Sequence, residues 1–326
     1  MKKRLAAIAS LLLATVLLLA SCGLGEKSSA EEAAAKPGSQ ETETEPTISI
    51  KISDLKRYLD SSSSMMELAQ RFFTDTIVYR GADGKYKFEP VNDSLPLSNY
   101  DWDGLRPGSG KELILEREGE PASIKGIDVS RYQGDVDWEK VAADGVKFVF
   151  VRLGYRGYSE GALITDEKFE EYVKGAAQHG IGVGIYFVTQ AITEEEAIEE
   201  AEFVLDSIRP YNITWPVVLD IEEAASITAR TVGLGAKDRT DQTIAFCEKI
   251  REAGYTPMLY CNIRWYLEEL ELERLTAYDK WFAQYFNRPF FPYEFTVWQY
   301  TNTGRVDGIK GDVDLNISMK DYSKKD

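Results

Sequence analysis

The C-terminal part of the chain carries eight short apolar runs, and their regular spacing restricts the fold more than any other feature. Stretches with helical periodicity separate the first five runs, whereas the last three follow one another closely. Strands joined by crossover helices run parallel, and eight of them can close into a barrel. The sequence therefore predicts an α/β fold, a TIM-like barrel of five βα units followed by three strands. The runs are GIDVS, FVFVRLG, GVGIYFVTQ, VVLDIE, TPMLYCN, KWFAQY, FTVWQY and GDVDLNIS.

Two of the helices between these strands have well-defined ends in the sequence. The helix expected over 194–208 begins after Thr193, which can form a capping box with Glu196. A second helix, over about 238–253, ends at Gly254. The first helix is expected to bury one apolar stripe, formed by Ala197, Ala201, Val204, Leu205 and Ile208.

The N-terminus has the pattern of an export signal. Residues 1–21 combine a basic start with an apolar stretch that is too short to form a permanent membrane-spanning helix. The LASC run that closes this stretch resembles a bacterial lipobox, in which the cysteine becomes the lipidated first residue of the mature protein. We therefore expect an exported lipoprotein, anchored through Cys22 to the outer face of the bacterial cell membrane.

Two further segments separate the signal from the barrel. Residues 22–46 hold almost no large apolar side chain and are expected to form a disordered tether. Residues 47–120 are expected to form a small appended α+β segment, either a domain of its own or a collar on the barrel. It would contain helices in ISDLKRYL and MMELAQRFF and a hairpin that turns at Ala82-Asp83-Gly84. The barrel itself is expected over 121–326.

The chain is acidic and poor in histidine and cysteine. Its formal net charge of −16 argues against nucleic acid, and against an anionic membrane bound by charge, because both need a basic surface. Three cysteines and one histidine leave too few ligands for the usual transition-metal sites, so no metal is expected. Catalysis would then depend on carboxylates. Cys247 and Cys261 are expected to be separate buried thiols, because their predicted helix and strand hold them at different heights.

The fourth apolar run, within WPVVLDIEEA, ends in three acids. Side chains alternate along a strand, so Asp220 and Glu222 should point the same way, with Cβ atoms roughly 6.5–7 Å apart, while Glu223 points elsewhere. Glycoside hydrolysis needs two such carboxyl groups, because one donates a proton and the other stays charged to face the developing cation. The sequence therefore places a candidate acid pair at the end of this strand.

The other predicted strands also end in polar or aromatic residues. The active site of a TIM-like barrel lies at the carboxyl ends of its strands, so this distribution favours an enzyme. The residues are Asp128, Arg152, Tyr186, Asp220, Glu222, Tyr260, Gln284, Trp298, Gln299 and Asp314.

Five motifs, in matching order and spacing, resemble the glycoside hydrolase family 25 lysozymes, the N-acetylmuramidases. They are GIDVSRYQGDVDW, VVLDIE, PMLYCN, VWQY and VDLN. The resemblance implies hydrolysis of the β-1,4 bond between N-acetylmuramic acid and N-acetylglucosamine in peptidoglycan, with no cofactor and no metal. It further implies that Glu222 is the general acid and that Asp220 stabilises the intermediate. Asp128 and Asp314 match the two further acids that line the site.

Peptidoglycan glycan strands would be held by side chains around these acids. Arg152 would steady a lactyl or peptide carboxylate of the substrate, or else serve as a structural ion-pair partner for one of these acids. Many family members carry a histidine beside the third-strand tyrosine, whereas here Tyr186 is followed by Phe187 and Val188. For Trp281, packing in the barrel is the alternative. The expected substrate-binding residues are Tyr186, Tyr260, Trp281, Trp298, Gln299 and Arg152.

Two mechanisms and three other functions stay open at this point. Asp220 can attack the sugar directly, or it can steady a ring formed by the sugar's own acetamido group, and the spacing from Glu222 favours the second. The main alternative to an enzyme is a non-catalytic lipoprotein that binds cell-wall glycan. A chitinase-like enzyme would carry a longer acidic motif, and a metal-dependent deacetylase would need more than one histidine.

Overall fold

The computed structural model describes residues 74–224 and 226–324. The predicted export signal, the lipidation site Cys22, the tether and the two helices predicted in ISDLKRYL and MMELAQRFF lie outside these residues. Within the described part, none of the helices combines the length and the apolar character that crossing a membrane requires.

Eight strands close into a barrel, and they correspond to the eight predicted apolar runs. They are β6 (Ile124–Val129), β7 (Phe148–Arg156), β9 (Gly182–Val188), β10 (Val217–Asp220), β11 (Pro257–Asn262), β12 (Asp279–Ala283), β13 (Val297–Gly304) and β14 (Val313–Ser318). Their order is β6-β14-β13-β12-β11-β10-β9-β7, and β7 pairs back to β6. A short extra strand, β8 (Leu163–Thr165), runs antiparallel to β7. The prediction of a mixed α/β barrel is therefore confirmed.

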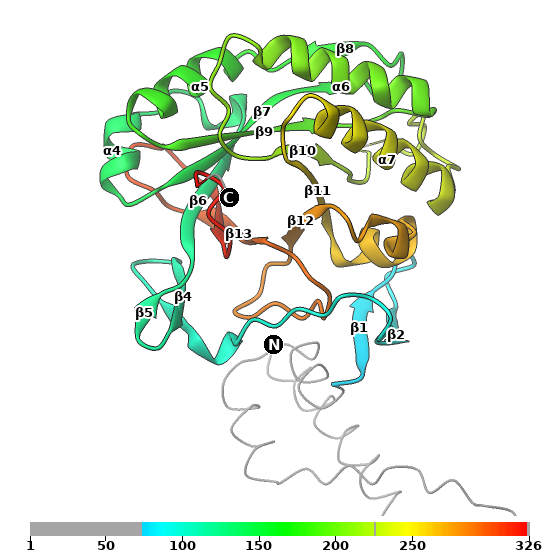
Figure 1. Ribbon diagram of the computed structural model, residues 1–326, viewed down its shortest axis with the longest axis horizontal. Coiled ribbons are helices and arrows are strands. Elements are labelled where there is room, and N and C mark those ends of the chain that lie inside the picture. Colours follow the sequence, from blue (N-terminus) through cyan, green and yellow to red (C-terminus); the bar gives the residue numbers. More distant parts are fainter. Residues whose placement is uncertain (1–73, 225, 325–326) are drawn as a thin grey trace, which may run out of the picture. The chain divides into compact units, whose positions relative to one another are not determined.

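Helices pack on the outside of one half of this barrel (Figure 1). They are α4 (Trp138–Ala143), α5 (Phe169–Gln178), α6 (Glu194–Ile208) and α7 (Ala236–Glu252). The connection from β11 to β12 holds only a π-helical turn, η4 (Trp265–Glu269), and a 3-10 turn, η5 (Leu272–Leu275). Its apolar residues are too irregularly spaced to share one face of an α-helix. Five βα units, as predicted for a TIM-like barrel, are therefore not confirmed.

The last strand also departs from a TIM barrel, because β14 runs antiparallel to both neighbours, β13 and β6. The chain between Gly304 and Val313 is too short for a crossover helix, so it can only turn back. This reversal brings the start of β14 to the end of the barrel where the parallel strands finish. We call this end the carboxyl end of the barrel.

The two predicted helices are confirmed, although α7 begins at Ala236, two residues before the predicted start. Helix α6 begins after Thr193, whose hydroxyl accepts a hydrogen bond from the Glu196 backbone N–H at 3.2 Å. Helix α7 is followed by Gly254 in the left-handed conformation, with φ of 87°. Cys247 and Cys261 are both buried free thiols, as expected.

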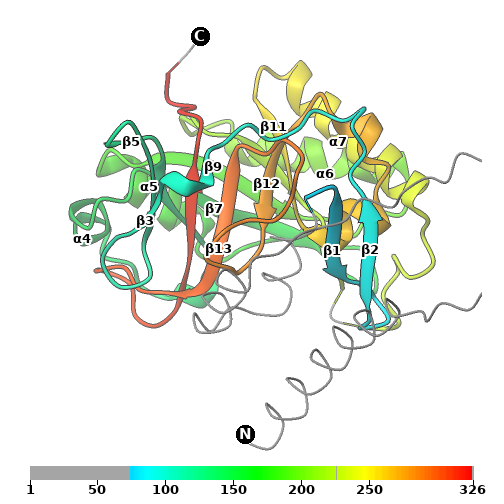
Figure 2. The same ribbon diagram turned by 90° about the horizontal axis from the view of Figure 1, so that it is seen from below.

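The segment before the barrel packs on the side that helices leave uncovered. It holds β1 (Thr76–Arg80) and β2 (Tyr86–Pro90), which form the predicted hairpin, and β3 (Leu105–Pro107), β4 (Leu113–Arg117) and β5 (Glu120–Pro121). The Ser98 backbone N–H donates to the Pro292 carbonyl at 2.7 Å, and Trp102 stacks on Phe295 with ring centroids 5.8 Å apart. Figure 2 shows the chain after β2 running across β12 and β13. We call residues 74–120 the collar, because these contacts join them to the barrel.

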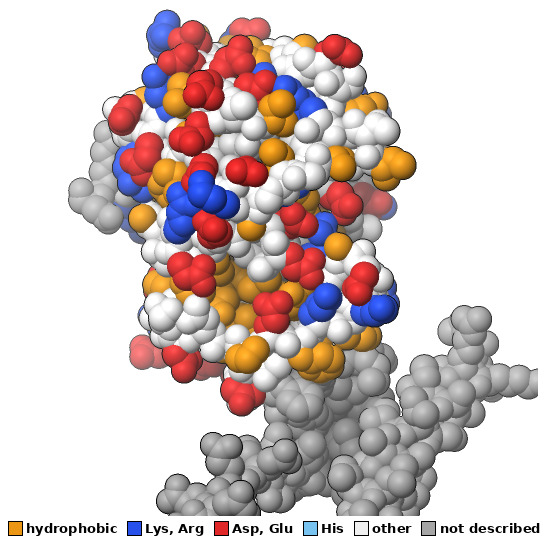
Figure 3. Space-filling view, turned by 90° about the vertical axis from the view of Figure 1, so that its right-hand side faces the viewer, with side chains coloured by type: hydrophobic (Ala, Val, Ile, Leu, Met, Phe, Trp, Pro, Cys, Tyr) orange, Lys and Arg blue, Asp and Glu red, His pale blue; other side chains and the backbone are white. Residues whose placement is uncertain are grey.

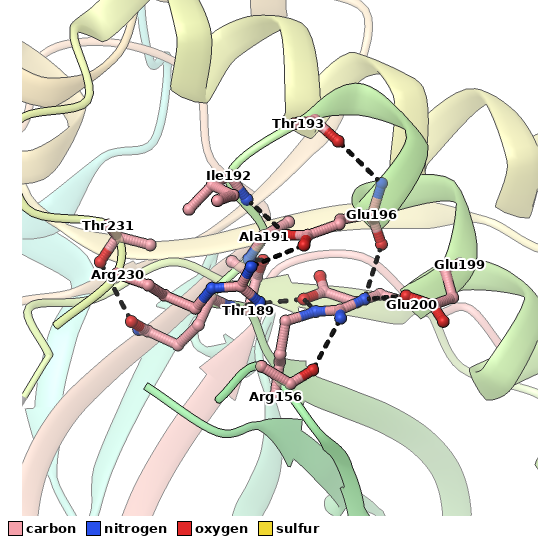
Figure 4. Close-up of polar contacts among 12 residues, drawn as sticks. Arg156, Thr189, Ala191, Ile192, Thr193, Glu196, Glu199, Glu200, Arg230 and Thr231 are labelled. Carbon is pink, nitrogen blue, oxygen red and sulfur yellow. Dashed lines mark hydrogen bonds and ion pairs between the residues drawn. The ribbon is translucent and has the colours of Figure 1, made fainter. Parts of the chain in front are cut away.

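A buried ion pair joins α6 to the end of β7 (Figure 4). Glu200 falls within the apolar stripe predicted for this helix, and its carboxylate lies 2.7 Å from the Arg156 guanidinium. Both side chains are buried. Glu199 lies at the same distance, 2.7 Å, from that guanidinium, but its side chain is 59% exposed. Burying a charge is costly unless it is paired, so Glu200 is what allows Arg156 to lie inside.

Replacing Glu200 with Ala is expected to lower the free energy of unfolding by about 3–5 kcal/mol, because Arg156 would remain buried without its inner partner. Glu199→Ala removes an exposed carboxylate from the same guanidinium and should cost below about 1 kcal/mol. Urea denaturation of the two variants measures the difference. Equal losses would show that burial of the pair is not what stabilises this junction.

Candidate active site

The four predicted acids lie at the carboxyl end of the barrel. Asp128 is close to the end of β6, and the antiparallel register of β14 places Asp314 directly opposite it. Asp220 is the last residue of β10, and Glu222 follows after Ile221, which is buried in the layer outside the barrel. Side chains therefore still alternate past the end of the strand, and Asp220 and Glu222 share the inner side.

These carboxyl groups act on one another electrostatically. Burial raises the pKa of Asp128 and Asp220 well above the usual range, and it also raises the pKa of Glu222. The charge of Asp314 raises the pKa of Asp128 further, while that of Glu222 acts on both Asp220 and Asp128. Burial raises the pKa of Asp314 to about 6. A cluster of this kind retains protons close to neutral pH, as a general acid must.

Asp128 is held by two side-chain amides. Gln299 Nε2 donates to its Oδ2 at 2.9 Å, and Asn316 Nδ2 donates to the same oxygen at 2.8 Å. Both amides are buried, so the predicted substrate contact at Gln299 is replaced in this structure by a contact with an acid. Sequence reasoning missed Asn316, although it lies two residues after Asp314 and must therefore share its face of β14.

The predicted aromatic residues lie at three different places: inside the barrel near the acids, deeper in the barrel, and outside the barrel. Tyr186 and Tyr260 lie inside the barrel, close enough to Asp128 and Asp220 for these charges to raise the pKa of both tyrosines after burial. Trp281 lies deeper, 1% exposed, with its ring centroid 4.4 Å from that of Tyr260, so a sugar cannot reach it. Trp298 is 0% exposed on the opposite face of β13, where it packs against Trp102 of the collar.

The sugar contacts expected at Trp281 and Trp298 therefore do not fit the positions of these side chains. Neighbouring strand residues point to opposite faces, and Gln299 takes the inner face of β13, which leaves Trp298 outside. Trp281 is on the inner face of its strand but near the middle of the barrel, where it fills the core. Tyr285, which the sequence did not single out, lies at the site instead. It is 48% exposed, and its hydroxyl donates to Gln299 Oε1 at 3.0 Å.

Arg152 is held by a buried carboxylate. Its Nε donates to Asp166 Oδ2 at 2.7 Å, and the same oxygen accepts the Arg131 backbone N–H at 3.2 Å. The guanidinium lies 5.2 Å from the ring of Tyr132, a largely exposed side chain. Arg152 is thus part of an internal ion pair, but the prediction that its partner is one of the four acids is wrong, because the partner is Asp166. The positive charge of Arg152 opposes the rise in the pKa of Asp220 and Glu222 caused by burial.

The loop that follows the acid pair is tied to the neighbouring elements. Glu223 forms an ion pair with Arg264 at 3.0 Å and so points away from the acid cluster, as predicted. Further along, Arg230 pairs with Glu196 at 2.6 Å, and the Thr231 hydroxyl bonds to Gln190 at 3.0 Å (Figure 4). These contacts fix the loop beside the N-terminus of α6. Among the described residues, no group of three or more His, Cys, Asp and Glu side chains is arranged to hold a metal ion.

Comparison with known proteins agrees with this geometry. Residues 127–309, more than half of the chain, match the glycosyl hydrolases family 25. The chain belongs to this family. It is therefore a glycoside hydrolase, and the predicted enzyme class is confirmed.

Individual relatives are distant. The chain is 28% identical to the uncharacterized protein YegX of Escherichia coli K12 over 204 residues, 60% of this chain and 71% of YegX. It is 25% identical to the autolytic lysozyme of Clostridium acetobutylicum over 194 residues, 59% of this chain but only 55% of that lysozyme. A family 25 glycosyl hydrolase from Bacillus anthracis shares the fold, with a TM-score of 0.53 and 24% identity over 66% of this chain and 96% of that one.

Proposed function

We propose that this glycoside hydrolase is an N-acetylmuramidase that cuts the β-1,4 bond between N-acetylmuramic acid and N-acetylglucosamine in peptidoglycan. The observation that carries the proposal is the gathering of four carboxyl groups at one end of the barrel, with Asp314 opposite Asp128 and with Asp220 beside Glu222. The relationship to a protein named autolytic lysozyme supports the choice of substrate.

Glu222 is the proposed general acid. It reaches solvent while its surroundings still raise its pKa, so it can hold a proton and meet the glycosidic oxygen of a bound strand. As the C1–O bond breaks, the proton passes to the leaving N-acetylglucosamine oxygen. The same carboxylate then takes a proton from the water that attacks C1, which restores the acid.

Asp220 is proposed to steady the cationic intermediate. Its Oδ1 is buried, and no described residue donates a hydrogen bond to it. An acceptor of this kind suits the N–H of the substrate's acetamido group, whose carbonyl oxygen would attack C1 to form a ring. The charge of Arg152 favours the ionised form of Asp220 that this contact needs.

The remaining side chains at the carboxyl end suit the binding of a glycan strand. Tyr285 and Tyr132 are 48% and 73% exposed and offer ring faces beside Gln299 and Arg152, while Tyr186 and Tyr260 lie inside the barrel. A basic surface is not needed for such a strand. On the face that Figure 3 shows, Lys and Arg side chains lie among Asp and Glu, in keeping with the acidic composition.

Incubation with purified peptidoglycan tests whether the protein cuts or only binds. A muramidase releases soluble fragments with new reducing ends, and it does so with the chain alone, since no cofactor or metal takes part in the proposed mechanism. A non-catalytic binding protein would sediment with the peptidoglycan and release nothing, and this result would replace the proposal with the alternative function.

We further propose that the protein is lipidated at Cys22 and held on the outer face of the cell membrane. Cys22→Ser should then move the protein from the membrane fraction to the soluble fraction, because one lipidation site carries the anchor. Fractionation followed by immunoblotting measures this. Unchanged membrane association of Cys22→Ser would contradict the anchor and leave the proposed hydrolysis untouched.

A further inference from the structure

Trp281 has a polar contact that packing alone does not explain. Its indole Nε1 donates to Asn316 Oδ1 at 2.7 Å inside the barrel. An indole N–H can only donate, so the Asn316 oxygen must face it. The amide nitrogen of Asn316 must then face the other way, toward Asp128 Oδ2 at 2.8 Å. Trp281 therefore fixes which end of the amide meets the acid.

Hydrogen bonds also fix the orientation of the Gln299 amide. Its Oε1 accepts hydrogen bonds from the hydroxyls of Tyr260 at 2.8 Å and Tyr285 at 3.0 Å. With its oxygen occupied by two hydroxyl donors, its Nε2 is turned to Asp128 Oδ2 at 2.9 Å. Two independent chains of hydrogen bonds thus deliver two N–H groups to one carboxylate oxygen.

We propose that Trp281, Tyr260 and Tyr285 are positioning residues that act on Asp128 through Asn316 and Gln299. Since two N–H groups occupy Oδ2, a proton that Asp128 holds is directed to its Oδ1. The role of Asp128 in hydrolysis rests on the proposed function, whereas the location of the proton rests on the hydrogen bonds alone.

The titration of Asp128 is also coupled to other titratable groups around it. They are Asp314 of β14, Asp220 and Glu222 at the end of β10, Tyr186 of β9, Tyr260 of β11 and Tyr285 after β12, with Arg152 of β7 acting on Asp220 and Glu222. Burial raises the pKa of Asp128, and the two amide donors oppose the rise because they stabilise the ionised carboxylate. Removing a donor should therefore move the titration of the Asp128–Asp314 pair to higher pH.

Carbon-13 NMR titration of aspartate carboxyl groups tests the inference directly, with the Asp128 resonance assigned through Asp128→Asn. Trp281→Phe keeps most of the ring but removes the N–H that holds Asn316. The apparent pKa seen at Asp128 is expected to rise by about one unit, the effect of losing one charge-assisted hydrogen bond. The acidic limb of kcat/KM on peptidoglycan should move the same way, with KM nearly unchanged.

Trp298→Phe is the matched control. It too removes a buried indole N–H, which donates at 2.9 Å to the Gln284 carbonyl on the outer side of the barrel, and it should leave the titration of Asp128 in place. An unmoved titration in folded Trp281→Phe would overturn the inference. So would a raised KM with an unmoved titration, because this result would mean that the substitution acts on substrate binding and not on Asp128.

Tyr285→Phe decides the matter if Trp281→Phe does not fold. Tyr285 is half-exposed, so loss of its hydroxyl endangers folding least, and it should give a smaller shift in the same direction. No shift would count against the inference. Because NMR does not require turnover, a wild-type protein that fails to cut peptidoglycan contradicts the proposed function alone, and an active enzyme with an unmoved titration contradicts this inference alone.

Discussion

Glu222→Gln is expected to lower kcat on peptidoglycan by about a thousandfold, because the amide cannot donate a proton to the leaving oxygen. KM should change little, since the side chain keeps its size and its place after β10. Glu222 is only partly buried and reaches solvent, so the variant should also fold normally. The release of new reducing ends from purified peptidoglycan, followed under substrate saturation, measures the loss.

Glu223→Gln provides the matched control for this variant. The two glutamates are neighbours in the sequence, but Glu223 pairs with Arg264 on the other side of the loop and is largely exposed. Its loss should change kcat by less than about twofold, as is usual for an exposed ion pair. If both variants lost activity equally, the effect would come from disturbing the loop, and Glu222 would not be the acid.

Asp220→Asn is expected to lower kcat by about a hundredfold or more, because it removes the negative charge that steadies the intermediate. The side chain is buried and no described residue donates to its Oδ1, so the amide disturbs few existing hydrogen bonds. The loss should therefore appear in kcat without a matching loss of stability, which thermal unfolding of the variant checks.

The acetamido route leads to a second prediction about Asp220. No covalent bond should form between this residue and the sugar, so rapid quenching of the wild-type enzyme should yield unmodified protein by mass spectrometry. A glycosyl ester trapped on Asp220 would show direct attack and overturn the acetamido route, while leaving both the substrate and the role of Glu222 in place.

The barrel and its acid cluster were predictable because they depend on local patterns. Alternation along one strand was enough to place Asp220 and Glu222 together and to send Glu223 away. The regular spacing of apolar runs was enough to predict eight strands and the end at which their polar residues gather.

Features that depend on contacts between distant segments were not predictable in this way. The partner of Arg152 is Asp166, which directly follows β8. Its position depends on the pairing of β8 with β7, and Asp166 belongs to no motif that would identify it. Trp298 could be placed outside only once Gln299 was known to face Asp128, since either could have been the inner residue. The depth of Trp281 depends on how side chains from all the strands fill the closed barrel, and the sequence of one strand does not reveal this.

The reversed direction of β14 was also not predicted from the sequence, and it affects the active site. The short connection after β13 was visible in the sequence, but its meaning depends on closure of the barrel onto β6. Because the strand is reversed, Asp314 contributes from the start of its strand and not from the end. The acid was identified for its motif, and the register explains why it reaches Asp128.

The reducing end of the product tests the central claim most directly. Soluble fragments released from peptidoglycan are reduced with borohydride, hydrolysed and analysed by mass spectrometry, with Glu222→Gln as the inactive control. The proposed muramidase yields reduced N-acetylmuramic acid. Reduced N-acetylglucosamine would instead mean that the other glycosidic bond is cut, and the account of the substrate given above would be wrong.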